Sequence, residues 1–324
     1  GKAAALTDAN LVLGYLDADF FLGGDMKLNL VAARTAIESS VAAPLNVTVE
    51  RAAWGMYEIA NEDVARAFRI HASERGFDYR SASMVAFGGS GPVQAMAVAR
   101  KLKIPRVVFP AGAGVMSAFG LLASPLAFEL ARSEPCSVTA LDAINFASGF
   151  QDMEDEASSL LLEAGVEAAD IRLRRRLDMR YQGQGYEIEV RLPDTNSMAE
   201  IFEDLPKLFL KTYTSTFSSN SLDEPLEIVT WKVEALGPEA LLSDGFRLES
   251  AANSGSALKG SRQVYFTDRY YDCPVYERGL LTPDMEVSGP ALIEERESTC
   301  VIGPGDVVLV DARRNLIVEL GDKQ

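Results

Sequence analysis

Histidine and cysteine are scarce in this chain of 324 residues, and their scarcity excludes several kinds of catalytic site. His71 is the sole histidine, so a Ser-His-Asp triad or a metal site with several histidine ligands has almost no material from which to be built. The three cysteines, Cys136, Cys273 and Cys300, are widely separated and form no CxxC pair. Scattered cysteines in an odd number indicate reduced thiols in a cytoplasmic protein rather than disulfides or a zinc site. We interpret all three as structural residues.

The chain also lacks an excess of positive charge and a long uninterrupted apolar helix. Its formal net charge of −16 argues against nucleic acid and against anionic membrane surfaces as partners. Residues 107–128 carry no charge, but two prolines and three glycines interrupt them. This pattern predicts a strand, a glycine turn and a buried helix rather than a membrane span. No secretory signal opens the chain, and it begins with Gly1 rather than Met, so we expect a part of a longer cytoplasmic protein.

The most informative pattern present is VAFGGSGP, residues 85–92. An apolar strand leads into three glycines within four residues, and Pro92 then opens a helix. Such a turn presents free N–H groups and the positive end of a helix, where a nucleotide or an anion can bind. The alternative is an ordinary tight turn between a strand and a helix. The pattern matches neither the GxGxxG fingerprint nor the GxxxxGK[ST] phosphate loop.

The periodicity of the first 130 residues predicts an α/β lobe. Asn29 and Thr48 are positioned to cap two helices, and the second helix has an apolar stripe from Val49 to His71. Short apolar strands follow at 83–87 and 106–109, each before a glycine turn and a helix. We therefore predict a first domain over residues 1–132.

The remaining residues, 133–324, predict an α+β domain. Helical patterns cover 142–164 and 201–213, and strand patterns cover 172–192 and 226–236. Residues 250–261 are small and polar, as in a loop or linker. From residue 263 onward, short β runs alternate with Gly and Pro, which predicts a small β sandwich or barrel. Adjacent Glu294 and Glu295 face opposite sides of a strand, so they are not expected to share a proton as a catalytic pair.

Several motifs, in this order, resemble the A-type subunit of the hydantoinase/5-oxoprolinase family. They are TDAN at 7–10, FLGG at 21–24, FGGSGP at 87–92, GVMSAFGLL at 114–122, DMRYQGQGYE at 178–187 and GPALIEE at 289–295. The motifs cover essentially the whole chain. Each is weak alone, and their shared order makes the resemblance specific.

The resemblance implies one lobe of an ATPase core of the actin, sugar-kinase and Hsp70 type. Residues 1–132 would be its second, adenosine-side lobe. ATP and Mg would be the cofactors, with the main phosphate and metal ligands in an N-terminal half that precedes Gly1, and no metal ligand in this chain. The implied nucleotide contacts are Gly88, Gly89, Ser90, Gly91, Gln94, Gly114 and Ser117. For Gly114 and Ser117, packing between helix and strand is the alternative.

Family members use ATP to open cyclic amides or imides such as hydantoins and 5-oxoproline, and their relatives carboxylate ketones. Phosphorylation makes the carbonyl oxygen of an amide a good leaving group before water attacks, and such phosphoryl transfer rests mainly on positioning and charge neutralisation. The candidates for contact with phosphates or substrate are Asp8, Thr7 and Asn10. Asp8 is alternatively the cap of a helix over 9–16. The chain alone is expected not to hydrolyse ATP.

One departure from the family pattern bears on function. The family usually has histidine where this chain has Gln94, and glutamine carries no proton at neutral pH. A non-catalytic scaffold that docks a B-type partner subunit is therefore a second hypothesis, and a ketone carboxylase subunit is a third. The expected partners are a small cyclic amide, the N-terminal half, the B-type subunit and further copies in an oligomer. Residues 182–187 contribute to the substrate pocket or to the partner contact, or form a structural hairpin.

Overall fold

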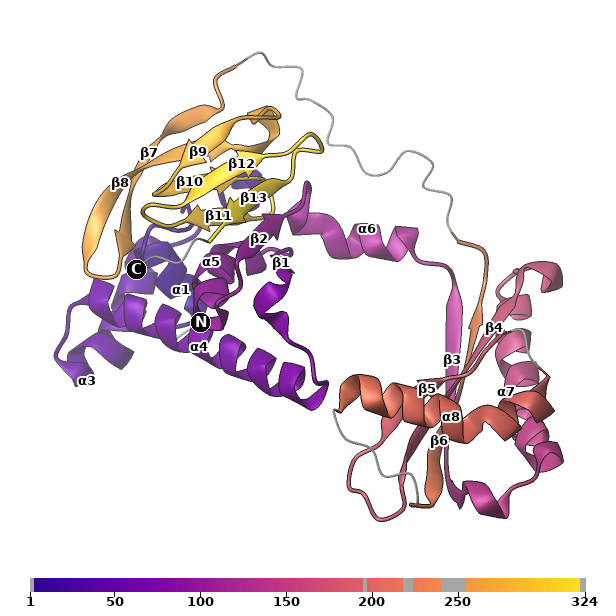
Figure 1. The fold of residues 1–324 in the computed structure, drawn as a ribbon. Coiled ribbons are helices and arrows are strands. Elements are labelled where there is room, and N and C mark those ends of the chain that lie inside the picture. Colours follow the sequence, from indigo (N-terminus) through magenta and orange to yellow (C-terminus); the bar gives the residue numbers. More distant parts are fainter. Residues whose placement is uncertain (1–2, 195–196, 218–223, 240–254, 321–324) are drawn as a thin grey trace. The chain divides into compact units, whose positions relative to one another are not determined.

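The computed structural model describes residues 3–194, 197–217, 224–239 and 255–320. The chain divides into two compact units (Figure 1). Unit 1 comprises Gly1–Leu121 and Leu242–Gln324, and unit 2 comprises Leu122–Leu241. This grouping differs from the predicted division at residues 132 and 133, because the C-terminal strands belong to the same unit as the N-terminal helices.

Both predicted helix caps of unit 1 are present. The Asn29 side chain accepts a hydrogen bond from Ala32 N (3.0 Å) at the start of α2, and that of Thr48 accepts one from Arg51 N (3.2 Å) at the start of α4. The α-helices that lie in or begin in unit 1 are α1 (Leu6–Val12), α2 (Leu30–Ile37), α3 (Ala43–Leu45), α4 (Val49–Glu74), α5 (Gly91–Leu102) and α6 (Met116–Ala123).

The buried faces of two helices differ from the prediction. In α4 the buried side is formed by Ala52, Ala53, Tyr57, Asn61, Ala65 and Ala72, about one residue away from the predicted stripe, and His71 is exposed. Short alanine side chains allow α4 to pack closely against α1 and α5. The prediction that the helix after the second glycine turn is buried is wrong, because α6 contains no buried residue. Apolar composition alone therefore does not decide whether a helix is buried.

The strands of unit 1 form two sheets. One has the order β1-β2-β13-β12-β9, in which β1 (Ser83–Val85) and β2 (Arg106–Phe109) are parallel. It is completed by β9 (Glu286–Ser288), β12 (Val307–Val310) and β13 (Leu316–Glu319). The other has the order β11-β10-β8-β7, with β7 at Leu258–Phe266, β8 at Arg269–Glu277, β10 at Ala291–Glu294 and β11 at Thr299–Ile302.

The C-terminal strands do not form a sandwich or barrel by themselves. β13 pairs antiparallel with β2, with Ile317 opposite Val108, so β9, β12 and β13 continue the sheet that β1 and β2 begin. Pairing with β2 satisfies backbone groups that would otherwise lie at an open sheet edge. The predicted loop at 250–261 is a strand from Leu258 onward, and its residues 250–254 lie outside the described part of the chain.

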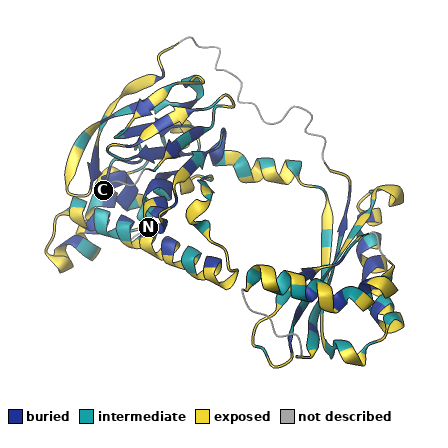
Figure 2. Ribbon diagram, in the orientation of Figure 1, coloured by how far each residue is buried: buried dark blue, intermediate teal, exposed yellow. Residues whose placement is uncertain are grey.

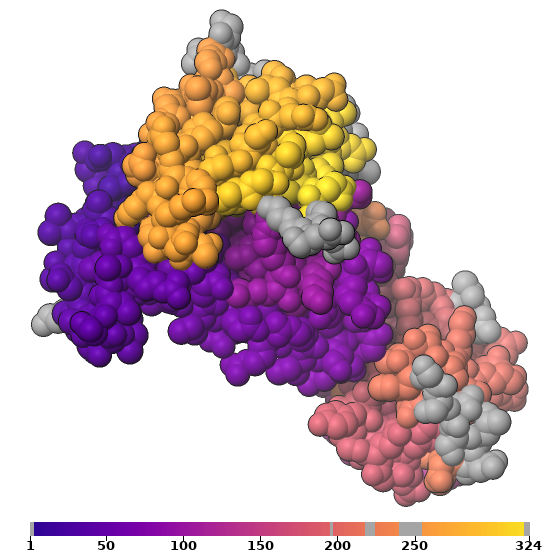
Figure 3. All heavy atoms as spheres, turned by 60° about the vertical axis from the view of Figure 1, so that its left-hand side comes forward, coloured from indigo at the N-terminus to yellow at the C-terminus, as the bar shows by residue number. Residues whose placement is uncertain are grey.

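One apolar core joins α5 to both sheets of unit 1. Met96, Ala99 and Leu102 of α5 pack with Phe109 of β2 and Ile293 of β10. Buried and exposed residues alternate along β12, as expected for a strand with one covered face (Figure 2). The C-terminal strands lie directly against the N-terminal helices in the space-filling view (Figure 3). Segments about 200 residues apart in sequence therefore share one core.

Unit 2 is a four-stranded antiparallel sheet with two long helices. The sheet order is β3-β6-β4-β5, with β3 at Ala127–Ser137, β4 at Arg172–Tyr181, β5 at Ile188–Arg191 and β6 at Leu226–Leu236. The helices are α7 (Ala143–Glu163) and α8 (Met198–Thr216), and their apolar residues form one core with the sheet around Trp231. Residues 182–187 connect the antiparallel strands β4 and β5, and Gln184 donates a hydrogen bond to the Tyr213 hydroxyl (3.0 Å). This motif is therefore a hairpin connection.

Candidate nucleotide site

The carboxyl ends of the parallel strands β1 and β2 bring the two predicted glycine turns together. The first turn, residues 88–91, follows β1, and the second, residues 111–114, follows β2. The N–H of Gly88 donates a hydrogen bond to the carbonyl oxygen of Ala113 at 2.8 Å. Ligands of open α/β sheets bind characteristically outside the carboxyl ends of parallel strands. The two turns thus meet where a ligand is expected.

Two glycines of the first turn face open space. Gly88 has a φ of +84°, which favours glycine, and a Cβ at Gly88 or Gly91 would have no neighbouring atom within 4 Å. Gly91 is also the first residue of α5, and the first N–H groups of a helix have no partner within the helix. Gln94 donates from Nε2 to Ser90 Oγ at 3.4 Å. The backbone here is accessible to a flat or anionic ligand.

Gly89 of the first turn and Gly114 of the second instead lie close to another part of the protein. A Cβ at Gly89 would lie 3.2 Å from the carbonyl oxygen of Glu297, and one at Gly114 would overlap Glu297 itself. Glu297 belongs to the loop between β10 and β11, residues 295–298, which we call the β10–β11 loop. For Gly114 the packing alternative is therefore the one that the contacts support.

Hydrogen bonds fix the β10–β11 loop to the second glycine turn. Glu295 Oε1 accepts hydrogen bonds from Gly114 N (3.3 Å) and from Ser298 Oγ (2.6 Å). On the far side of the loop, Arg296 forms an ion pair with Asp25 at 2.7 Å. A small cavity of about 30 Å³ lies beside the loop, enough for about one water-sized group. It is lined by Leu16, Asp17, Phe20, Phe21, Leu22, Gly89 and residues 294–299.

A network of ion pairs lies next to the β10–β11 loop. Arg262 of β7 forms ion pairs with Asp17 and Glu294, both at 2.6 Å, and Glu294 is almost fully buried. Lys259 also pairs with Glu294, at 2.9 Å, and lies 3.4 Å from the centroid of the Phe20 ring. The network ties residues 17–20 to the second sheet. Glu294 and Glu295 have separate partners, because Glu294 ends β10 and Glu295 lies in the loop that follows.

Sequence patterns gave no signal for Asp17, Arg262 or Ser298. Each is a single polar residue without a motif around it. Asp17 and Arg262 pair across 245 residues of chain, whereas Ser298 bonds to Glu295 within the same loop. Only the position of Glu295 directly after a β run placed it near a strand end. The pairing of Asp17 with Arg262 therefore depends on tertiary structure alone.

The three predicted substrate or phosphate contacts lie on α1. Asp8 Oδ2 accepts a hydrogen bond from Ala5 N at 2.8 Å, which is a helix-capping contact at the start of Leu6–Val12. Thr7 is exposed, and Asn10 is buried with its Oδ1 atom unpaired in the described structure. Ser117, on α6, is exposed. The hydrogen bonds that join the glycine turns to the β10–β11 loop include none of these four residues.

Among the described residues, no three His, Cys, Asp or Glu side chains are placed to hold a metal ion. No described helix is long and apolar enough to cross a membrane.

Comparison with known proteins identifies the family. Residues 1–130 match the family described as Hydantoinase/oxoprolinase, and residues 136–320 match the Hydantoinase/oxoprolinase C-terminal domain. The chain belongs to the hydantoinase/oxoprolinase family. The resemblance predicted from the sequence motifs is thereby confirmed.

Similar curated proteins include enzymes that act on different compounds. The MJ0964 protein of Methanocaldococcus jannaschii is 32% identical, with 97% of this chain and 44% of the relative covered. Caprolactamase subunit alpha of Pseudomonas jessenii is 28% identical, over 96% of this chain and 45% of that subunit. The acetone carboxylase beta subunit of Xanthobacter autotrophicus is also 28% identical, over 97% of this chain and 45% of the subunit.

Solved structures agree with this assignment. The ATP-dependent caprolactamase from Pseudomonas jessenii has a TM-score of 0.75 at 27% identity, covering 99% of this chain and 47% of the other. Nucleotide-free acetone carboxylase has a TM-score of 0.70 at 26% identity, over 97% of this chain and 46% of the other. The chain thus spans just under half the length of these relatives.

Proposed function

We propose that this chain is the adenosine-side part of an ATP-dependent enzyme that opens a cyclic amide or imide of the hydantoin or 5-oxoproline type. The observation that supports this proposal is the meeting of two glycine turns at the carboxyl ends of the parallel strands β1 and β2, with open backbone at Gly88 and Gly91. Relatives that include an ATP-dependent caprolactamase and a 5-oxoprolinase also support ATP-linked or amide-opening chemistry.

The proposed fit to ATP uses backbone rather than side chains. Glycines without a Cβ allow a flat purine to lie on the first turn, and the N-terminus of α5 favours a nearby ribose oxygen or phosphate. Ser90 and Gln94 offer polar groups beside that turn. When bound, ATP would supply the phosphoryl group that converts the amide oxygen into a leaving group. We assign the main phosphate and Mg ligands to the part of the longer family proteins that this chain does not span.

Asp8, with Thr7 and Asn10, remains our proposed contact to phosphates or substrate. The substitution Asp8→Asn separates this role from capping, because an asparagine oxygen can still accept from Ala5 N while the charge is removed. In the enzyme completed with its remaining half, we expect Asp8→Asn to retain stability and lose ring-opening activity. Unchanged activity would remove Asp8 from the proposal.

A ketone carboxylase subunit is the alternative, supported by the similarity to acetone carboxylase. The similar caprolactamase and acetone carboxylase chains are each one subunit of their enzyme. We therefore also propose a B-type partner subunit for this chain. ATP turnover that requires bicarbonate would favour the carboxylase, whereas turnover with a cyclic amide alone would favour the hydrolase. If the completed assembly turned over ATP with neither substrate, the non-catalytic scaffold would be favoured.

The direct test is ATP binding by the chain with a methyl group added at Gly91. The Cβ of Gly91→Ala meets no protein atom within 4 Å, so we expect folding to be unaffected and ATP affinity to fall at least tenfold. Gly55→Ala on α4 is the matched control, because it also adds a methyl into open space on a helix. Isothermal titration calorimetry measures the affinities of both variants for ATP and ADP. Equal affinities in the two variants, or no binding by the unaltered chain, would reject the site. We expect no ATP hydrolysis by the chain alone.

A further inference from the structure

The five-stranded sheet of unit 1 has one covered face and one open face. Val107, Val318, Val308 and Val287 lie in lateral register on β2, β13, β12 and β9, and all four are buried in the core. Side chains alternate between the two faces of a strand, so the residues between these must lie on the opposite side.

Four apolar side chains form a continuous row across the open face. Val85 is paired in register with Val108, Val108 with Ile317, and Ile317 with Leu309. Val85 and Leu309, at the two ends of the row, are 56% and 44% exposed, and the two between them are half-buried by their neighbours. Three strand spacings make the row about 14 Å wide. We call it the β1–β12 apolar row.

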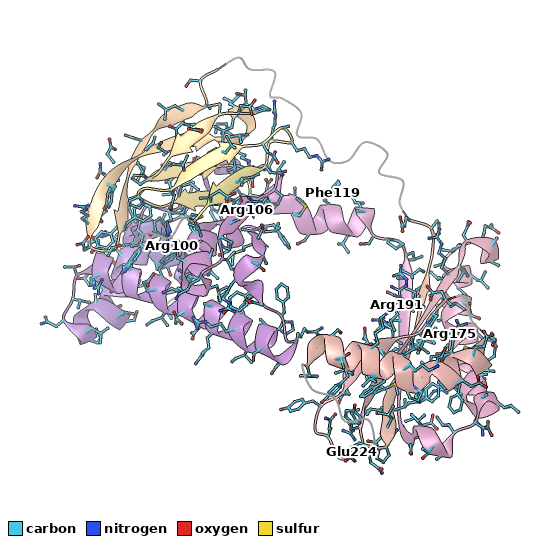
Figure 4. All side chains as sticks on the ribbon, in the orientation of Figure 1. Arg100, Arg106, Phe119, Arg175, Arg191 and Glu224 are labelled. Carbon is cyan, nitrogen blue, oxygen red and sulfur yellow. The ribbon has the colours of Figure 1, made fainter. Side chains whose placement is uncertain are left out.

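Further side chains extend and border this row. Phe87 follows Val85 by two residues and Val307 precedes Leu309 by two, and each is 47% exposed. Polar residues surround them: Glu286 lies opposite Leu309 on β9, and Arg106 forms an ion pair with Glu319 at 2.6 Å. Figure 4 labels Arg106 on β2. An apolar centre with a polar border is the usual composition of a protein interface.

An apolar row on the open face of this sheet needs an explanation. Contiguous exposed apolar patches mark interaction sites, whereas the open face of a largely antiparallel sheet is usually polar. In addition, β1 is an edge strand among the described residues, with β2 as its sole sheet partner there, so its other edge offers backbone groups for pairing. A covering layer is therefore expected over the row and beside β1.

We propose that the β1–β12 apolar row is the docking surface for the part of the longer family proteins that this chain does not span. The relatives extend over more than twice the matched length, so they contain enough further chain to supply a complete layer. The segment that docks presents its own apolar face, as a helix does when it covers a sheet. This inference rests on family membership and is independent of nucleotide binding.

Alkylation of introduced cysteines tests the proposal. Val85→Cys and Leu309→Cys are made separately in a Cys136→Ser background, with Ile144→Cys on α7 as a control that is exposed in unit 2. The rate at which maleimide alkylates each cysteine is measured in the chain alone and in a graft. In the graft, the chain replaces the matching part of the MJ0964 protein. Covalent linkage in the graft gives the docking segment a high effective concentration.

We expect maleimide to react rapidly at all three positions in the chain alone. In the graft, the rates at 85 and 309 are expected to fall at least tenfold while the rate at 144 is unchanged. Equal rates at 85 and 309 in the graft and in the chain would overturn the proposal. Protection already present in the chain alone, together with a dimer in sedimentation, would also overturn it by identifying a second copy as the occupant.

A charge variant gives a second, independent measurement. Because Val85 and Leu309 are exposed, the double variant Val85→Lys/Leu309→Lys is expected to leave the thermal midpoint of the chain alone unchanged. In the graft it is expected to lower the midpoint by several degrees and to restore fast alkylation at Val307→Cys. A graft that tolerates both lysines without either change would contradict the proposal.

Discussion

Glu295 reaches from the end of β10 to the backbone of Gly114, 181 residues away in the chain, and accepts its N–H hydrogen bond at 3.3 Å. The same oxygen accepts a hydrogen bond from the Ser298 hydroxyl, so the β10–β11 loop is closed upon itself and attached to the second glycine turn. Because that turn in turn bonds to Gly88, the loop holds both turns in place.

Gly114→Ala is expected to destabilise the protein, although it adds only one methyl group. The added methyl would overlap Glu297, whose backbone is fixed by the bonds of Glu295, and overpacking of this kind costs about 1–3 kcal/mol. Urea denaturation measures the loss. Gly120→Ala, whose Cβ meets nothing within 4 Å, serves as the control and should not be destabilised.

Glu295→Ala is expected to lower the free energy of unfolding by about 1–2 kcal/mol, because it leaves Gly114 N and Ser298 without their acceptor. Glu295→Gln retains an acceptor oxygen and should preserve most of the stability. If the glutamine and alanine variants lost equal stability in the same denaturation experiment, charge rather than hydrogen bonding would be the contribution of Glu295.

Two arginines of unit 1 should differ sharply on replacement by alanine. Arg262→Ala removes a partner of the buried Glu294, and breaking a buried pair costs about 3–5 kcal/mol. Because Lys259 still pairs with Glu294, we expect the lower part of that range. Arg296→Ala breaks an ion pair with Asp25 whose members are both well exposed, which costs at most about 1 kcal/mol. A comparable loss in both variants, measured by chemical denaturation, would show that Glu294 is better solvated than its burial indicates.

Stability in acid should depend partly on Glu50. Partial burial raises the pKa of this carboxyl, but the hydrogen bond and charge of Arg34, at 2.5 Å, outweigh burial, so the pKa lies below its ordinary value of 4.5. A carboxyl with a lowered pKa in the folded state stabilises the protein above its unfolded pKa, and this contribution is lost as pH falls through the folded pKa. The free energy of unfolding should therefore decrease below about pH 4.5, and less steeply in Glu50→Gln. Identical slopes in the two proteins would contradict this prediction.

The cysteines should differ in reactivity according to burial. Burial raises the pKa of the Cys300 thiol to about 12, and Cys273 is likewise fully buried, whereas Cys136 is partly exposed. Because the thiolate is the reactive form, we expect an aromatic disulfide reagent at pH 8 to modify Cys136 alone in the native chain and all three cysteines in denaturant. Rapid modification of Cys300 in the native chain would indicate local opening around β11.

Local rules explain which elements the sequence predicted well. The capping residues Asn29 and Thr48 fixed two helix starts, and the strands at 106–109 and 226–236 match β2 and β6 residue for residue. Gly88 could be recognised as a turn residue from its neighbours alone. Each of these features depends on residues within a few positions of one another.

The tertiary structure decided which face of α4 is buried, that α6 is exposed, and that the C-terminal strands join β1 and β2. It also decided that Gly114 packs against Glu297 and that Arg262 supports Glu294. The pairing of β13 with β2 and the contact of Gly114 with the β10–β11 loop join segments about 180 to 210 residues apart in sequence, for which local propensity carries no information. The sequence by itself determined the elements and the family motifs, whereas the common core and the contacts around the glycine turns exist only because distant backbone and side-chain groups satisfy one another in the folded chain.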